Sequence, residues 1–252
     1  MMIAEEDREK TAFTFEGVQY MYVGAPFGLK HLPSHFQRVM EVILDGLDNV
    51  KVYVDDIIIF TKVSLKEHTR VIKSVLDRLE RWNIRTRMDK CAFFYKQIQI
   101  LGHIVDSDGI EPDPTKIESA LKWPIPRTNK DIQSFMGLVN FFGEHLPGLA
   151  GIARPLNEQR NNKKFRAPRD WTPALESSFS QLKELISNAL KLSYPVEGHT
   201  FVLATDASHY SCGGILYQEV DGKKRYITVF SKTLSKTEQR YPTIRRELLG
   251  LL

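Results

Sequence analysis

The stretch Val50–Phe60, VKVYVDDIIIF, places two adjacent aspartates inside an apolar, β-branched run. β-Branched residues favour strands, whereas an ionised carboxylate loses free energy when it is buried without a partner. One continuous buried strand is therefore excluded, and the run predicts two strands with Asp55 and Asp56 at the turn between them. Two interpretations of the pair remain open. It is either an ordinary hairpin turn or a site where a divalent cation relieves the repulsion between neighbouring carboxylates.

Helices are predicted where apolar residues recur every three or four positions behind a residue that caps a helix. The segment 31–47 shows this spacing with Pro33 near its start, and Ser64 with Glu67 forms a capping-box pattern before the next helix. Further helix starts are predicted at Asp113–Pro114, Thr128, Thr172–Pro173 and Ser235–Glu238.

Strands are predicted from short runs rich in β-branched and aromatic residues that are bounded by turn residues. These runs are 97–105, 200–208, 213–220 and 224–231. The DGKK sequence at 221–224 is a hairpin signal between the last two. The chain is therefore predicted to form two modules of mixed helix and strand, bridged by a small helical section.

Composition restricts the environment of the chain. No apolar run approaches the roughly 18 residues that span a bilayer, and the mixed charges of MMIAEEDREK are not those of a signal peptide. The two cysteines, Cys91 and Cys212, are too few for a disulfide framework and lack zinc-site spacing. We therefore expect an intracellular protein, in the cytoplasm or nucleus, that is not secreted and has no membrane partner.

A basic segment stands out within a chain whose net charge is only +4. Residues 160–169, RNNKKFRAPR, contain five cations and no anion. A solvated linker and a surface that contacts phosphates both fit this pattern.

Several motifs resemble, in order, the Pol polyproteins of Gypsy-like LTR retrotransposons. YVDD at Tyr53–Asp56 resembles the polymerase signature of reverse transcriptases, and APFGLKHLPSHFQRVM upstream is similar to the segment that contacts template and nucleotide. DKCAFFYKQIQILGHIVDSDGI follows downstream, and WPIPRTNKDIQSFMGLVNFF and IARPLNE resemble the thumb and connection. The resemblance extends over essentially the whole chain.

The resemblance implies a polymerase site in the palm. Asp55 and Asp56 would be its metal-binding carboxylates. Lys90 would protonate the departing pyrophosphate as a general acid, with an ordinary surface cation as the alternative. The implied nucleotide-binding and template–primer-binding residues are Phe27 and Gly28 beside the nucleotide, Gln37 and Tyr53 near the template, and Leu101, Gly102 and His103 at the primer end. For His103 a packed structural histidine is the alternative.

A second implied site lies near the carboxyl end of the chain. Asp206, in TDAS, and Glu247, in RRELLGLL, resemble the first two acidic positions of an RNase H domain, which binds two Mg²⁺ ions. The plain alternatives are a turn or cap residue for Asp206 and a solvent-facing or ion-paired Glu247. Gly213 and Gly214 fit the close backbone packing of the second strand of that fold.

The resemblance also implies the organisation of the chain. The expected α+β architecture has a partial palm with a ferredoxin-like sheet at 1–106, a helical thumb and connection at 107–168, and an RNase H-like α/β domain at 169–252. A third palm carboxylate, most of the fingers and the remaining RNase H carboxylates are expected to be absent. Gly143 and Glu144 stand where the family tends to carry arginines.

The implied function is RNA-directed DNA polymerisation with RNase H activity, a two-metal phosphoryl transfer using Mg²⁺, with Mn²⁺ as a substitute. The implied partners are an RNA template, a DNA primer, an RNA–DNA hybrid, deoxynucleoside triphosphates and the rest of the Pol polyprotein, in a cytoplasmic virus-like particle or the nucleus. Because ligands are expected to be missing, this chain is predicted to be impaired or inactive alone. A nucleic-acid-binding remnant or domesticated fragment without catalysis, and a relic that does not fold, remain alternatives.

Overall fold

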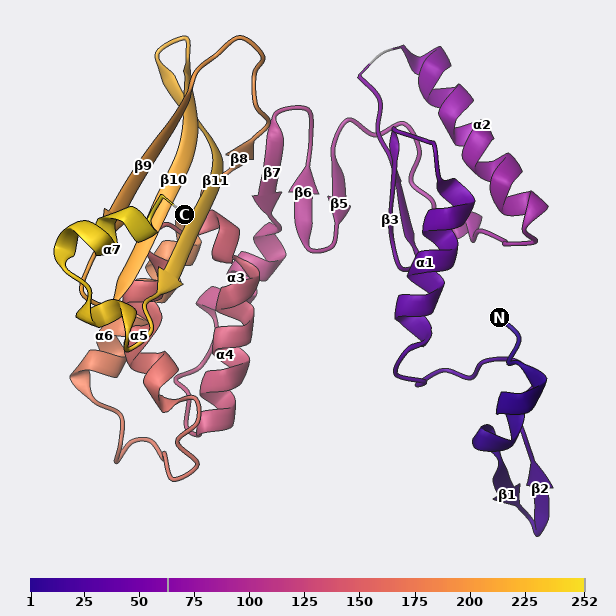
Figure 1. The fold of residues 1–252 in the computed structure, drawn as a ribbon, viewed down its shortest axis with the longest axis horizontal. Helices are drawn as coiled ribbons and strands as arrows, with labels where there is room; N and C mark the ends of the chain where they lie inside the picture. Colours follow the sequence, from indigo (N-terminus) through magenta and orange to yellow (C-terminus); the bar gives the residue numbers. More distant parts are fainter. Residues whose placement is uncertain (63, 252) are drawn as a thin grey trace. The chain divides into compact units, whose positions relative to one another are not determined.

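The computed structural model describes residues 1–62 and 64–251, which form the expected α+β fold. The chain divides into two compact units, Met1–Phe94 and Tyr95–Leu252. Figure 1 shows the first from indigo to purple and the second from magenta to yellow. Within the described residues, no helix is both long enough and apolar enough to cross a bilayer.

The first unit contains two small antiparallel hairpins and two helices. A 3-10 segment, Glu5–Thr11, precedes the hairpin of β1 and β2, and a second hairpin, of β3 and β4, lies between the helices. The bounds are β1 Phe13–Phe15, β2 Val18–Tyr20, α1 Leu32–Leu44, β3 Val50–Tyr53, β4 Asp56–Ile59 and α2 Leu65–Arg81. A short 3-10 turn, Met88–Lys90, follows α2.

The core of this unit joins α1, α2 and the second hairpin. Met40 and Ile43 of α1 pack with Val75 and Leu79 of α2 and with Val50 of β3. Ser64 caps α2 as predicted, because its hydroxyl accepts a hydrogen bond from the Glu67 amide. The helices predicted after residue 31 and after Ser64 are therefore confirmed.

The second unit contains two antiparallel sheets and a group of helices. The first sheet has the order β5-β6-β7-β8 and the second the order β11-β10-β9. The strands are β5 Ile98–Ile100, β6 His103–Val105, β7 Gly109–Pro112, β8 Leu192–Ser193, β9 Phe201–Ala207, β10 Ser211–Val220 and β11 Lys223–Thr233. The helices are α3 Pro114–Leu121, α4 Asn129–Phe141, α5 Leu149–Gln159, α6 Pro173–Ser187 and α7 Thr243–Leu249.

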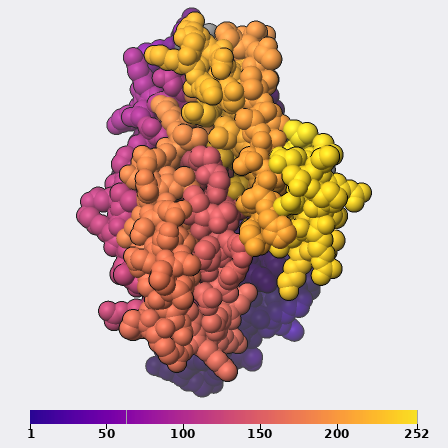
Figure 2. Space-filling model, turned by 90° about the vertical axis from the view of Figure 1, so that its left-hand side faces the viewer, coloured from indigo at the N-terminus to yellow at the C-terminus, as the bar shows by residue number. Residues whose placement is uncertain are grey.

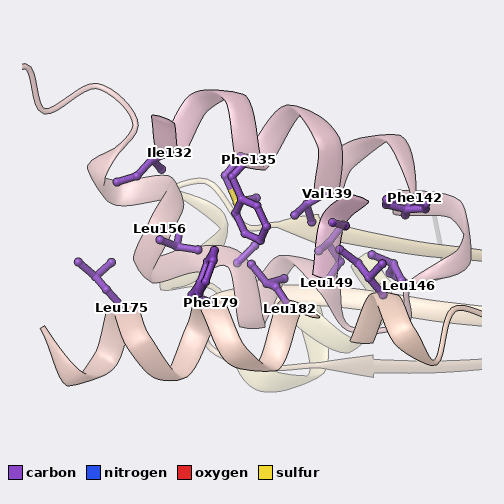
Figure 3. Packing of buried hydrophobic residues seen from close by; sticks show 14 of the residues in the cluster. Ile132, Phe135, Val139, Phe142, Leu146, Leu149, Leu156, Leu175, Phe179 and Leu182 are labelled. Carbon is purple, nitrogen blue, oxygen red and sulfur yellow. The ribbon is translucent and has the colours of Figure 1, made fainter. Parts of the chain in front are cut away.

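A hydrophobic core holds α4, α5 and α6 together (Figure 3). Phe135 of α4, Leu156 of α5 and Leu182 of α6 are fully buried in it, and burial of each such side chain contributes about 1.5–3 kcal/mol. This core extends across the predicted domain limit at residue 168, because α6 packs with α4 and α5. The domain limits 1–106, 107–168 and 169–252 therefore stay a prediction.

Two local predictions are wrong. Residues 97–105 form a hairpin rather than one strand, because Leu101 and Gly102 adopt positive φ values of 50° and 77° and reverse the chain. Ser235 and Glu238 exchange the capping hydrogen bonds, but they cap only the 3-10 turn Glu238–Arg240. The final helix, α7, begins after Pro242.

Candidate active site

The aspartate pair lies at the tip of the hairpin formed by β3 and β4. Tyr53 pairs with Asp56 across the strands, so Val54 and Asp55 form a two-residue turn. Both carboxylates are on the exposed side of the hairpin tip. The predicted split of this apolar run into two strands is confirmed, and it leaves both charges accessible to a cation.

Val54 gives this turn an unusual backbone. Its φ is 53°, a region that β-branched residues rarely occupy because the side chain crowds the backbone. Residues held in such regions cost about 1–3 kcal/mol and persist only where their surroundings hold them in place.

Gln37 of α1 supplies part of that support. Its side-chain oxygen accepts a hydrogen bond from the Val54 amide, and its Nε2 donates to the Val52 carbonyl at 3.0 Å and to Glu41 Oε1 at 2.8 Å. A primary amide donates and accepts at once, so one side chain holds two backbone groups on the β3 side of the turn. This contact was not predicted from the sequence, where Gln37 was implied only to support the template segment.

The pair fits part of a magnesium site. Carboxylate oxygens are the hard ligands that Mg²⁺ prefers, and the ion keeps several waters or substrate phosphates as its other ligands. No group of three or more His, Cys, Asp or Glu side chains suited to a metal ion is present within residues 1–62 and 64–251. Asp55 and Asp56 therefore offer two donors rather than a complete protein cage.

The other implied palm residues of the first unit lie on its surface. Phe27 is fully exposed at 104% of its reference area, next to Gly28 with φ 96°. Tyr53 is 57% exposed beside the aspartates. Lys90 is exposed at the end of the 3-10 turn, and its amide donates to the Arg87 carbonyl. The structure attaches Gln37 to the hairpin tip, while the roles of Phe27, Gly28 and Lys90 stay predictions.

The implied primer-end residues form the turn between β5 and β6 in the second unit. The ring of Phe141 on α4 fills the space beside Gly102, where a Cβ atom would lie 2.7 Å from the ring. The His103 ring stacks on Phe141 at 4.9 Å and on His145 at 5.3 Å between centroids. His103 is thus packed among rings, as the structural alternative predicts, while its contact with a primer stays a prediction.

His145 anchors this aromatic group. It is buried at 1% exposure, and its Nδ1 lies 2.8 Å from the Leu190 carbonyl oxygen. Burial lowers the pKa of His145 below its usual value, and the nearby His103 lowers it further.

The second implied site lies on β9 and α7. Asp206 faces Gly213 of β10 in register and is exposed, and Glu247 is half-buried on α7. The end of α7 lies against β9, since a Cβ on Gly250 would be 3.1 Å from the Cβ of Thr205. The structure thus brings the element that carries Glu247 to the strand that carries Asp206.

Gly213 and Gly214 have the structural role that was predicted. A Cβ on Gly213 would lie 2.9 Å from the Phe230 carbonyl oxygen, and one on Gly214 would lie 2.4 Å from the Phe230 ring. Only glycine therefore lets β10 and β11 approach this closely.

Comparison with known proteins identifies the class. Residues 2–105 match the family model "Reverse transcriptase (RNA-dependent DNA polymerase)", and residues 171–252 match "RNase H-like domain found in reverse transcriptase". The fold is similar to a foamy viral protease-reverse transcriptase in complex with double-stranded DNA, with a TM-score of 0.83 at 23% identity over 99% of this chain and 44% of that chain. The chain thus has the fold and the domains of a reverse transcriptase with an RNase H-like region.

Relatives define the group within that class. The chain is 39% identical to the retrovirus-related Pol polyprotein from transposon 297 of Drosophila melanogaster, over 98% of this chain and 23% of the relative. It is 35% identical to that from transposon gypsy of the same organism, over 99% and 25%. The chain belongs to the Pol polyproteins of Gypsy-like LTR retrotransposons, as the motifs predicted. It spans about a quarter of the length of these relatives, and both matched families generally use divalent metals.

Proposed function

We propose that the chain carries the palm, thumb and RNase H-like portions of an RNA-directed DNA polymerase that uses two-metal phosphoryl transfer. One observation carries the proposal: two adjacent exposed carboxylates sit on a hairpin tip that Gln37 holds by two hydrogen bonds on its β3 side. The match to the reverse transcriptase family over residues 2–105 supports it.

In this proposal, Asp55 and Asp56 hold Mg²⁺, which when bound stabilises the charge that develops on the transferred phosphate. The chain itself supplies position. The hairpin directs both carboxylates outward, and Gln37 keeps the backbone of Val54 in place. Phe27, Gly28 and Tyr53 border the deoxynucleotide and the RNA template, and Lys90 donates a proton to pyrophosphate. Leu101, Gly102 and His103 support the end of the DNA primer.

The RNase H-like region is proposed to act on the RNA strand of an RNA–DNA hybrid. Asp206 and Glu247 are its metal-binding carboxylates, and the packing of α7 against β9 supports their common placement. A compartment inside the cell, either a cytoplasmic virus-like particle or the nucleus, fits this substrate, and the remainder of the Pol polyprotein is the expected partner.

A second candidate function is nucleic-acid binding without catalysis. The described residues lack a cluster of three metal-binding side chains, and loss of one ligand from a two-metal site costs orders of magnitude in rate because such catalysis depends on positioning and charge. This observation favours a chain that is impaired alone and that binds nucleic acid through its basic surface.

Primer extension on an RNA template with Mg²⁺ and deoxynucleotides distinguishes the two functions. The polymerase proposal predicts extension that Asp55→Asn abolishes and that Asp77→Asn, a control on the exposed face of α2, leaves unchanged. Absence of extension by the folded wild-type chain, with duplex binding intact, would instead support the binding function.

A further inference from the structure

The basic loop, residues 160–169 between α5 and α6, is an ordered part of the second unit. Phe165 is fully buried in the helical core, and its ring meets Trp171 edge-on at 6.4 Å. The Ala167 amide donates to the Arg127 carbonyl at 3.0 Å, and Arg166 pairs with Thr128 in an isolated β-bridge. The loop is therefore fixed against the start of α4 and is not a free linker.

Two arginines of the basic loop are used to shape it. Arg166 donates from its guanidinium to the carbonyls of Phe165 and Lys163, and Arg169 donates to the Lys164 carbonyl. Arg169 also pairs with Asp170 at 2.8 Å. That pairing, with a hydrogen bond from the Arg166 amide, lowers the pKa of Asp170 to about 2, so this carboxylate is ionised and engaged.

The two lysines of the basic loop face solvent. Lys163 and Lys164 are exposed and form no ion pair among the residues that the structure describes. The backbone contacts described above bring the loop next to Arg127 and the start of α4. Segments 127–131 and 160–170 together hold seven basic and two acidic side chains, although the whole chain has a net charge of only +4. Positive charge is thus concentrated at one corner of the second unit.

A polar hollow of about 460 Å³ adjoins this corner. It is lined by Gln133 of α4, Asn157 of α5, Thr233 of β11, and Arg160 and Asn161 of the basic loop. The Gln133 amide already donates to the Arg160 carbonyl. The hollow therefore adds amide, hydroxyl and guanidinium donors beside the exposed lysines, and Figure 2 shows the salmon-coloured segment that includes the loop on the molecular surface.

We propose that the basic loop and the polar hollow beside it form a binding surface for the phosphate backbone of a nucleic-acid duplex. Lysine, arginine and amide side chains are the groups that contact phosphates. A protein partner would be expected to use aromatic or arginine anchors. The one aromatic residue of the loop, Phe165, is buried, and Arg166 and Arg169 are bonded within the loop. The choice of an RNA–DNA duplex as ligand rests on the proposed function, whereas the charge and donor pattern does not.

The test is the salt dependence of duplex binding by the full chain. Fluorescence anisotropy with a labelled RNA–DNA hybrid, without deoxynucleotides, compares the wild type with the double variant Lys163→Gln/Lys164→Gln. Each phosphate contact contributes about 0.9 to the slope of log affinity against log salt, so the slope is expected to fall by roughly 1.8 and low-salt affinity by about tenfold. Both side chains are exposed, so the melting temperature should not change.

A matched control carries the same charge change elsewhere. Lys66→Gln/Lys73→Gln alters two exposed lysines of α2 and is expected to leave the slope near that of the wild type. Equal slopes for the two double variants would overturn the proposal, because the effect would then be one of net charge alone. The proposal would also be overturned if Lys163→Gln/Lys164→Gln lost binding to polyglutamate but kept binding to the hybrid, since that result indicates an acidic protein partner.

The outcome is separable from that of the proposed function. A chain that does not extend primers but loses hybrid binding in the loop variant supports the surface and not the polymerase. A chain that extends primers while the loop variant binds like the α2 control supports the polymerase and overturns the surface.

Discussion

Two turns of this molecule are built alike and held differently. The β3–β4 turn and the β5–β6 turn each join two short strands through two residues, and each contains a non-glycine residue at positive φ, Val54 at 53° and Leu101 at 50°. The first is held by polar contacts, through the Gln37 side chain. The second is held by packing, through Phe141 against Gly102 and His103.

The difference matches what each turn exposes. Support by hydrogen bonds from one side leaves Asp55 and Asp56 in water, where they are available to a cation. Support by rings covers the turn at Gly102, and the two turn residues, Leu101 and Gly102, carry no ionisable group. The first turn is thus expected to contribute to chemistry with little effect on stability, and the second to contribute to stability.

The largest effect is expected from removing the carboxylates of the first turn. Asp55→Asn/Asp56→Asn should lower primer extension by about 10³-fold or more, because metal positioning supplies most of the catalysis in such sites. Its melting temperature should stay within about 2 °C of the wild type, since exposed substitutions rarely change stability by more than about 0.5 kcal/mol. A large loss of stability would contradict this difference between the two turns, because it would show that the aspartates stabilise the fold.

The second turn should show the opposite behaviour. Gly102→Ala places a Cβ 2.7 Å from the Phe141 ring at φ 77°, so overpacking and backbone strain should together destabilise the second unit by roughly 2–4 kcal/mol. Gly148→Ala is the matched control, because Gly148 has φ 71° and nothing within 4 Å of the added Cβ. Its cost should be about 1–2 kcal/mol, and equal costs in urea unfolding would show that Phe141 does not hold the turn.

Removal of the polar support of the first turn should have an intermediate effect. Gln37→Met keeps the length of the side chain but removes its bonds to Val52 and Val54, which should cost roughly 1–2 kcal/mol in the first unit. Primer extension should fall by about tenfold while the metal requirement stays. Gln181→Met, at an exposed glutamine of α6, should change neither quantity. A Gln37 variant that behaves like this control would show that the Gln37 hydrogen bonds (the Gln37 clamp) do not hold the first turn.

The sequence predicts the first turn better than the second for a physical reason. Two charges in a β-branched run cannot be buried, so the turn at Asp55 follows from local residues alone. At Ile98–Val105 only Gln99 and His103 are polar, and no charged residue forces a turn. The reversal at Leu101–Gly102 packs against the ring of Phe141 on α4, which is far away in the chain. Such a contact has no local signature, and the segment was therefore predicted as one strand.

The same reasoning applies to the candidate sites. Asp55, Asp56, Asp206 and Glu247 are predicted because motifs carry them, and the glycines of β10 because the resemblance to an RNase H domain implies a closely packed second strand. The Gln37 clamp required the structure, since a glutamine on a half-buried helix face has many possible partners. The basic loop is ambiguous in sequence, because the burial of Phe165 and the backbone contacts to Arg127 and Thr128, which show that the loop is held in place, appear only in the structure.

The smallest expected effect is a pH dependence of stability that arises from His145, in the ring stack beside the second turn. The pKa of His145 is lowered in the folded chain, mainly by burial, so the unfolded chain binds a proton more readily. The folded state favours the neutral form of His145. The contribution of this histidine to the free energy of unfolding should therefore be fully present above pH 6.5 and fall as the pH drops from 6.5 towards the lowered pKa. His145→Phe should flatten this dependence in unfolding curves between pH 7.5 and 5, whereas His199→Gln, at an exposed histidine, should leave it unchanged. If His145→Phe kept the full acid sensitivity, the ring stack at the second turn would not be its source, and protonation elsewhere in the unit would have to explain it.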